Sequence, residues 1–195
     1  MDYTNVISEY ISAVTDTLQM LDIKALNTVI NVLCEARARN AQIFTFGNGG
    51  SAATASHFAN DFNKGISEYT EKKFRFLCLN DNMPTVMAIA NDIGYEEIFR
   101  FQLKGRLAQG DLVIGISGSG NSLNVVYAAE YAKSQGNKVI GITGYDGGKL
   151  KVLSDVSLHV PVDDMQITED IHMIFDHLMM SVFYQSFLQK PEARI

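Results

Sequence analysis

The chain has 195 residues, of which 47% are hydrophobic and 19% are charged, proportions typical of a folded globular protein and not of a disordered one. A formal net charge of −6, without any run of Lys or Arg, argues against nucleic acid as the main partner. Asp2 and Glu9 interrupt the N-terminal stretch, which argues against a signal peptide, and no run approaches the roughly 20 apolar residues that span a bilayer. We therefore expect one cytoplasmic domain over residues 1–195, with no membrane partner.

The N-terminal region predicts two helices. Apolar side chains recur at three- and four-residue spacing across residues 2–20 and again across 22–40. We expect these helices to form a helical hairpin over about residues 2–40. A sheet core should then occupy about residues 41–188.

Beyond this region, short strands alternate with helices. The β-rich runs are nearly continuously apolar, as in strands covered on both faces, and lie at 42–46, 75–79, 112–116, 138–142 and 156–160. Helical patterns follow at 51–62, 84–91, 95–108, 122–135 and about 165–188, and Pro191 marks a frayed tail. This alternation predicts an α/β fold with a five-stranded parallel sheet and right-handed crossovers. Cys34 in a helix and Cys78 in a strand are both expected to be reduced core residues.

Three of the predicted strands run into glycine-rich turns that resemble one another: FGNGGSA after the first, SGSGNSL after the third and TGYDGGK after the fourth. Glycine lets backbone N–H groups face outward, and a following helix adds unpaired N–H groups and partial positive charge, so such turns can bind an anion. Ser117, Ser119 and Ser122 add hydroxyl donors. The alternative is a tight turn with Ser122 as the helix N-cap. Walker A and Rossmann spacings are missing, which favours a small phosphate ester over a nucleotide.

Two helices carry titratable side chains. His57 and Asp61 lie four residues apart, so they project from the same helix face. The final helix holds a second set, Glu169, His172, Asp176 and His177. Spacing alone leaves open that His57 and Asp61 are a core or a solvated pair. His159, in a predicted strand, is expected to be structural.

Four segments together resemble the sugar isomerase (SIS) domain proteins, and among them the bacterial phosphoheptose isomerases. These segments are GNGGSAATASHFANDF at 47–62, ANDIGYEEIF at 90–99, GISGSGNS at 115–122 and GITGYDGGKL at 141–150. The resemblance covers nearly the whole chain. It implies a flavodoxin-like, doubly wound five-stranded sheet, a phosphosugar ligand, and a homotetramer with its sites at subunit interfaces.

Matched position by position, the resemblance implies a role for individual residues. The substrate-binding set is Asn48, Gly49, Ser51, Asp92, Ser117, Gly118, Ser119, Ser122 and Glu169. Within it, the three serines of the 117–122 loop would hold the phosphate, and Asn48 and Ser51 would lie on the sugar side. Asp61 and His177 match an acid–base pair, with Asp61 as the base and His177 as the acid or ring-opening residue.

The resemblance also implies a metal site. His57, Asp61, Glu169 and His177 stand where the family carries His, Glu, Gln and His, a set that can bind zinc, and the residue types found here suit Zn²⁺. Glu169 and His177 are about 12 Å apart along an ideal helix, so both reach one ion only with extended side chains.

The chain departs from the family pattern at several of these positions. Asn60-Asp61 replaces a Glu-Glu pair, Gly118 replaces a threonine and Glu169 replaces Gln. Where the family has Gly-Arg, this chain has Asn63-Lys64-Gly65. Lys64 either supplies a cation as a point charge or is a solvated helix end.

These features predict a phosphosugar aldose–ketose isomerase that moves a proton through an enediol. The first-choice reaction is sedoheptulose 7-phosphate to D-glycero-D-manno-heptose 7-phosphate. Two alternatives stay open: an isomerase or sensor for another phosphosugar, and a non-catalytic SIS adaptor that associates with the bacterial replication initiator. The presence of both Asp61 and His177 disfavours the adaptor, which needs no acid–base pair.

Overall fold

The computed structural model describes residues 1–188, so the expectation at Pro191 lies outside the described residues. The strands are β1 (Ile43–Gly47), β2 (Phe76–Cys78), β3 (Leu112–Ser117), β4 (Lys138–Thr143) and β5 (Val156–His159). The α-helices are α1 (Thr4–Gln19), α2 (Ile23–Ala38), α3 (Gly50–Asn60), α4 (Met83–Asp92), α5 (Arg100–Leu103), α6 (Leu123–Ser134), α7 (Gly148–Leu153) and α8 (Met165–Leu188). Shorter helical turns are the π-helix η1 (Asp61–Gly65) and the 3₁₀ turns η2 (Ile66–Tyr69) and η3 (Tyr95–Glu97).

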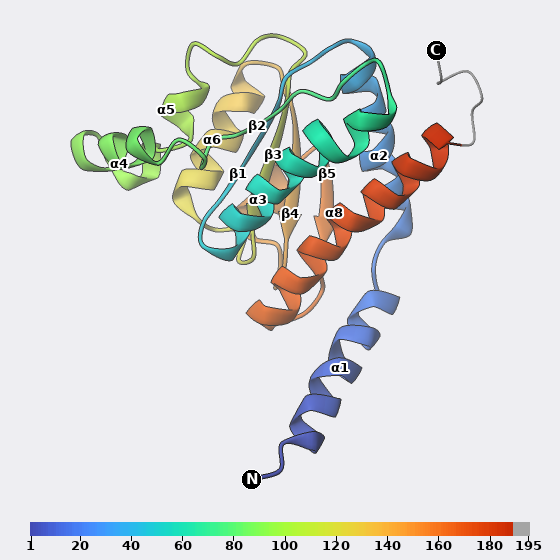
Figure 1. Cartoon of the computed structure of the whole chain (residues 1–195). Coiled ribbons are helices and arrows are strands. Elements are labelled where there is room, and N and C mark those ends of the chain that lie inside the picture. The colour runs from blue at the N-terminus through green and yellow to red at the C-terminus, as the bar shows by residue number, and fades with distance from the viewer. Residues whose placement is uncertain (189–195) are drawn as a thin grey trace.

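The five strands form one parallel sheet in the order β2-β1-β3-β4-β5, which confirms the predicted flavodoxin-like topology (Figure 1). In the register of the sheet, Gly47 lies opposite Ile116, and Ser117 lies opposite Thr143. The carboxyl ends of β1, β3 and β4 therefore lie in a row. The glycine-rich turns that follow them meet along that edge.

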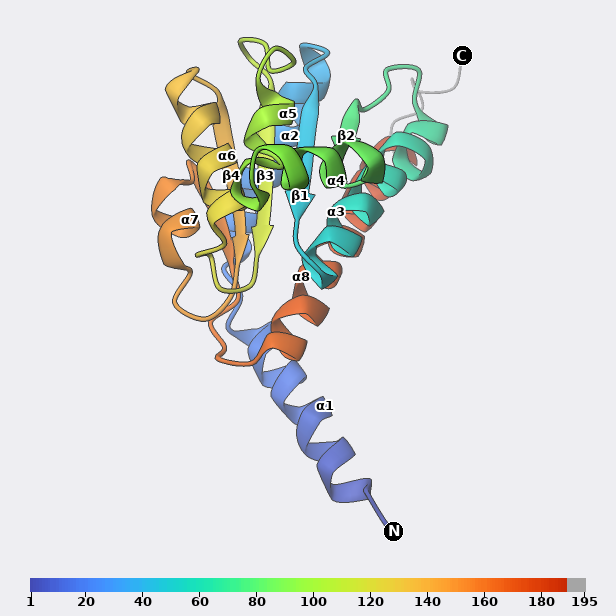
Figure 2. The same ribbon diagram turned by 90° about the vertical axis from the view of Figure 1, so that its left-hand side faces the viewer.

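Two hydrophobic cores hold helices on the two faces of the sheet. The α2, α3 and α8 helices pack on one face, and α4, α5, α6 and α7 on the other. Figure 2 shows this layering, with α6 and α7 on one side of the strands and α3 and α8 on the other. Because strand residues alternate between the two cores, β1 and β3 are buried throughout and β4 is buried after its first residue, as the apolar runs predict, whereas the edge strands β2 and β5 are partly exposed.

The turns after β3 and β4 are hydrogen-bonded to each other. The Gly144 N–H donates to the Gly118 carbonyl at 2.7 Å, and the Leu150 N–H donates to the Gly120 carbonyl at 2.9 Å. A Cβ on Gly120 would lie 1.9 Å from the Gly147 carbonyl oxygen, and Gly120 has a φ of +65°. Only glycine fits where the two backbones approach so closely.

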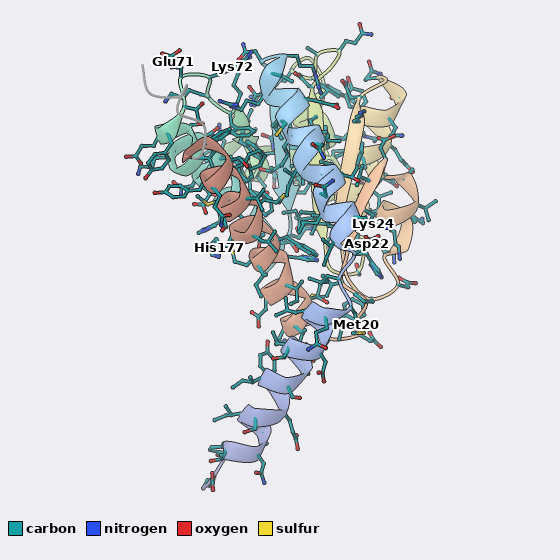
Figure 3. All side chains as sticks on the ribbon, turned by 90° about the vertical axis from the view of Figure 1, so that its right-hand side faces the viewer. Met20, Asp22, Lys24, Glu71, Lys72 and His177 are labelled. Atoms are coloured by element: carbon teal, nitrogen blue, oxygen red, sulfur yellow. The ribbon has the colours of Figure 1, made fainter. Side chains whose placement is uncertain are left out.

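The predicted helical hairpin is wrong. Helix α1 projects away from the body of the molecule, and α2 continues onward along the sheet without folding back on α1 (Figures 1 and 3). Asp22 caps α2 by accepting from the Lys24 and Ala25 N–H groups, and the apolar face of α2 is buried on the sheet. Ala13 and Val14 of α1 pack against the edge of the same core, and Tyr10 Oη donates to Asp170 Oδ2 of α8 at 2.5 Å.

Two other expectations need correction. Cys34 is exposed, because α2 turns Leu33 and Ala36 toward the sheet and Cys34 to the outer side, whereas Cys78 is buried as predicted. Burial raises the pKa of the Cys78 thiol to about 11. The predicted helix at 95–108 is broken into η3 and α5, and the chain passes Gly105 at a φ of +80°.

Among the described residues, no helix is both long enough and apolar enough to cross a bilayer.

Candidate active site

Two neighbouring helices bring four titratable side chains together. His57 lies on α3, Asp61 begins the π-helix that continues α3, and Asp176 and His177 are adjacent on α8. The two helices lie side by side on one face of the sheet (Figures 1 and 2), and His177 projects from α8 (Figure 3). One nitrogen or oxygen from each of the four residues lies within 4.8 Å of the others. The change from α- to π-helix at Asp61 is a feature that recurs at functional sites.

His57 lies close to both His177 and Asp61. His57 Nε2 lies 3.1 Å from His177 Nε2 and 3.3 Å from Asp61 Oδ2, and His177 Nε2 lies 4.0 Å from Asp61 Oδ2. Asn60 Nδ2 donates to Asp61 Oδ1 at 2.9 Å, which orients the carboxylate. A hydrogen bond between the two ring nitrogens requires one ring to donate and the other to accept. The structure therefore brings together the predicted base and the predicted acid.

Asp176 is the fourth residue of the group. Its side chain is fully buried, its Oδ2 lies 3.8 Å from His57 Nε2, and neither carboxylate oxygen has a hydrogen-bond partner among the described residues. Burial, followed by the nearby Asp61 carboxylate, raises the pKa of Asp176 to about 8. The sequence analysis included Asp176 among the titratable residues of the final helix but assigned it no role. Its position next to His177 was the signal that could have placed it in the site.

Glu169 lies outside this group, so the predicted metal set is not assembled as expected. Its carboxylate lies against Gly50 in the first turn of α3, where a Cβ would come within 2.2 Å of Glu169 Oε2. A helix N-terminus is favourable for a carboxylate. His172, one turn before Asp176, is buried, and burial lowers its pKa to about 4, so it is neutral at physiological pH.

The serine-rich loop after β3 keeps its hydroxyl groups close together. Ser117 Oγ and Ser122 Oγ are 3.3 Å apart, and the Asn121 N–H donates to Ser119 Oγ at 3.2 Å. Ser122 occupies the N-cap position of α6 but its side chain makes no capping hydrogen bond. The helix end therefore does not use this hydroxyl, in contrast to the alternative of a simple N-cap. A Cβ on Gly118 would lie 2.8 Å from Met165 Sδ, so the Met165 side chain would have to shift to admit a larger residue.

A cavity of about 560 Å³ lies beside this loop, lined by Ser119, Asn121, Tyr145, Asp146 and Asp163. Two carboxylates in its wall disfavour an anion, so the cavity does not mark a phosphate position. The hydroxyl and N–H groups of the loop itself are better suited to that role.

Asn48 is held by two residues that the sequence analysis missed. Asn48 and Asn124 exchange two amide hydrogen bonds of 2.9 Å, and Tyr95 Oη donates to Asn48 Oδ1 at 2.8 Å. Tyr95 belongs to the ANDIGYEEIF segment, which was the available signal for it. Ser51, in the first turn of α3, is buried, and Gly49 before it has a φ of +54°.

Three further residues lie apart from the α3–α8 group. Asp92 is exposed at the end of α4, a helix that packs on the opposite face of the sheet. Lys64 Nζ forms an exposed ion pair with Glu68 Oε2 at 2.5 Å, which matches the alternative of a solvated helix end. His159 Nδ1 lies 3.1 Å from Thr143 Oγ1 within the sheet, and burial lowers its pKa.

Comparison with known proteins agrees with this geometry. Residues 2–144 match the SIS domain. A phosphoheptose isomerase of Helicobacter pylori is 38% identical over 167 residues, 86% of each chain, and one of Aliarcobacter butzleri is 36% identical over 174 residues, 89% of each. The solved structure of phosphoheptose isomerase GmhA from Neisseria gonorrhoeae superposes with a TM-score of 0.84 at 29% identity, covering 93% of this chain and 96% of that one. The chain belongs to the SIS domain family.

Proposed function

We propose that this protein is an aldose–ketose isomerase that converts sedoheptulose 7-phosphate to D-glycero-D-manno-heptose 7-phosphate. The observation that carries the proposal is the pairing of the Asp61 carboxylate with the His177 imidazole, 4.0 Å apart. It occurs in a chain 36–38% identical to proteins named phosphoheptose isomerase. A non-catalytic adaptor has no need of such a pair.

In this proposal, Asp61 removes a proton from C1 of the ketose while His177 protonates the C2 carbonyl oxygen, which gives the enediol. Asp61 then returns a proton to C2, and the C1 hydroxyl gives its proton to His177 as the aldehyde forms, which restores both groups. The contact between His57 and His177 would set which nitrogen of His177 carries the proton. The serine hydroxyls of the 117–122 loop would hold the phosphate, and Asn48 and Ser51 would bind the sugar.

We further propose that the α3–α8 group holds a divalent metal ion, for which zinc suits the donor types. The fit is supported by Asp176, a buried carboxylate with no hydrogen-bond partner among residues 1–188, beside two imidazoles and a second carboxylate. When bound, such an ion would polarise the carbonyl oxygen of the sugar.

We also propose that residues 1–195 form one SIS domain and that four copies assemble into a homotetramer with the sites at subunit interfaces. Apolar residues left exposed on the projecting α1, among them Val6, Ile7 and Ile11, support an assembly, because a helix seldom leaves such a stripe in water. The position of Asp92, away from the α3–α8 group of its own chain, also agrees with sites that draw on two subunits.

The test is an assay of the purified protein against a panel of ketose phosphates in deuterated water, with and without chelator. We expect aldose formation to be fastest with sedoheptulose 7-phosphate and the product to carry solvent deuterium at C2, as an enediol requires. When the Asp61→Asn variant is assayed in the same way, the exposed Glu71→Gln variant serves as the control for removal of a carboxylate. Preference for another ketose phosphate would assign that sugar as the substrate. If no ketose phosphate is turned over, the isomerase proposal is rejected.

A further inference from the structure

We infer that Asp176 is a direct ligand of the metal ion in the α3–α8 group, and that Glu169 is not. The ligand set is then His57, Asp61, Asp176 and His177, all within one chain. This inference rests on the metal-binding part of the proposed function and goes beyond it, because the SIS resemblance implies Glu169 and gives Asp176 no role.

The Asp176 carboxylate lies in an environment that favours a bound cation. It is fully buried, and neither oxygen has a hydrogen-bond partner among the described residues. A buried carboxylate without partners is costly, so proteins pair such groups with a cation or a metal. Thr168 and His172, on the same face of α8 at four-residue spacing, offer it no cation, because Thr168 is uncharged and burial keeps His172 neutral.

The distances between the donor atoms can be compared with those of a zinc site. Around a tetrahedral zinc ion with bonds of about 2.0–2.2 Å, ligand atoms lie about 3.3–3.6 Å apart. The separations from His57 Nε2 are 3.1 Å to His177 Nε2, 3.3 Å to Asp61 Oδ2 and 3.8 Å to Asp176 Oδ2. These three separations lie close to the tetrahedral values, that from His177 Nε2 to Asp61 Oδ2 is 4.0 Å, and all four donor atoms lie within 4.8 Å of one another.

The charges of the proposed ligands and the lengths of their side chains also suit a divalent ion. Two carboxylates, together with two imidazoles that would bind as neutral ligands, balance the charge of a divalent cation. Asp61 is one methylene shorter than the Glu that the family carries, and Asp176 adds a second carboxylate from the opposite helix. Glu169 lies outside the group, since its carboxylate lies against Gly50 at the start of α3.

The experiment compares three single variants of the full chain with the wild type: Asp176→Asn, Glu169→Gln and the surface control Glu71→Gln. Each protein is stripped with chelator, and the dissociation constant for Zn²⁺ is measured by isothermal titration calorimetry. We expect Asp176→Asn to weaken Zn²⁺ binding by at least about 100-fold, at or above the effect of losing a supporting partner of a ligand. Glu169→Gln and Glu71→Gln should stay within about twofold of the wild type.

A second readout identifies the ligand directly. With Co²⁺ in place of Zn²⁺, Asp176→Cys should bind the ion through its thiolate and add a sulfur-to-cobalt charge-transfer band that the wild type lacks. A residue that acts only by packing cannot produce this band. Circular dichroism of each stripped variant checks folding, and Asp176→Cys keeps the test valid if Asp176→Asn does not fold.

The inference is overturned if Glu169→Gln weakens binding as much as Asp176→Asn, if Asp176→Asn binds Zn²⁺ normally, or if the wild type binds no Zn²⁺. None of these measurements uses turnover. Loss of Zn²⁺ binding in Asp176→Asn therefore supports the ligand even if no sugar phosphate is isomerised, and turnover without dependence on Asp176 rejects the ligand while the proposed function stands.

Discussion

At the scale of single residues, two aspartates of the site occupy different environments. The Asp61 side chain is 14% exposed and accepts a hydrogen bond from Asn60, whereas Asp176 is fully buried without such a bond. Carboxyl groups in unlike surroundings can take unlike roles, one as a base and one as a structural or metal-binding group.

Replacing Asp61 tests its role as the base. Asp61→Asn keeps nearly the same shape but cannot accept a proton at neutral pH, so turnover should fall by about 100-fold or more. Affinity for the phosphosugar should change little, because the serine loop is intact. Turnover and binding are measured together with bound metal. Full turnover would remove Asp61 from the chemistry, and loss of metal with partial rescue by added zinc would show that it acts chiefly as a ligand.

The buried Asp176 predicts a pH dependence of stability in the metal-stripped protein. Its pKa is raised from 3.8 to about 8 by burial, so between these values the folded state binds more protons than the unfolded state. The free energy of unfolding therefore falls as pH rises through this window, and the full stability is present only below it. Asp176→Asn cannot titrate, so its melting temperature should rise relative to that of the wild type between about pH 5 and pH 8. Parallel melting curves for the two proteins would contradict this.

At the scale of elements, the site depends on the turns at the carboxyl ends of β1 and β3 and on the side-by-side packing of α3 and α8. The turn after β3 presents serine hydroxyls, and its partner turn after β4 holds it in place through backbone hydrogen bonds. Ligands of open α/β sheets bind at this edge.

The serine loop is tested with Ser119→Ala. Because Ser119 is predicted to bond a charged phosphate oxygen, the variant should lose about 1–3 kcal/mol of phosphosugar binding. Its melting temperature should be unchanged, since Ser119 accepts only one local backbone hydrogen bond, from Asn121. Calorimetric titration with a phosphorylated and an unphosphorylated sugar separates the phosphate contribution. An unchanged dissociation constant for the phosphorylated ligand would reject the assignment.

The contact between the two turns is tested with Gly120→Ala, and Gly136→Ala is the matched control. Both glycines have positive φ, +65° and +75°, but only at Gly120 would the new Cβ collide with backbone, the Gly147 carbonyl. Gly136→Ala should cost about 1–2 kcal/mol of unfolding free energy for its backbone conformation. Gly120→Ala should cost a further 1–3 kcal/mol or so for the clash. Equal losses in urea denaturation would show that the turns do not need this close approach.

At the scale of the whole molecule, the unusual feature is α1, which projects from the body and leaves Val6, Ile7 and Ile11 exposed (Figures 1 and 2). Its contact with the rest of the chain is limited, with Tyr10 bonded to Asp170 near the start of α8. Apolar surface of this kind is typical of a subunit interface.

Light scattering should therefore report a mass about four times the 21.6 kDa of the chain. Ile7→Glu places a charge in the exposed apolar stripe and should shift the protein to smaller species, whereas Glu9→Gln on the same helix should leave the mass unchanged. A monomer at micromolar concentration in the wild type would contradict the assembly.

The sequence alone determined what depends on local pattern: the strands and their order of appearance, the glycine-rich turns, the final helix, and the motifs of the SIS family. Continuous apolar runs and glycines at strand ends act within a few residues, so they can be read without the fold. The predicted sheet was confirmed for this reason. The family motif also predicted Asp61 and His177 as a pair, and their side chains lie 4.0 Å apart.

Only the tertiary structure decided which side chains meet and which faces are covered. Glu169 and His177 share a helix, but the side-by-side packing of α3 and α8 makes Asp176 the neighbour of His57 and leaves Glu169 at the start of α3. In the same way, the packing of α2 on the sheet turned Cys34 outward and left α1 without the hairpin contact. Helical periodicity tells which residues share a face, but the direction of that face follows from the packing of whole elements around the sheet.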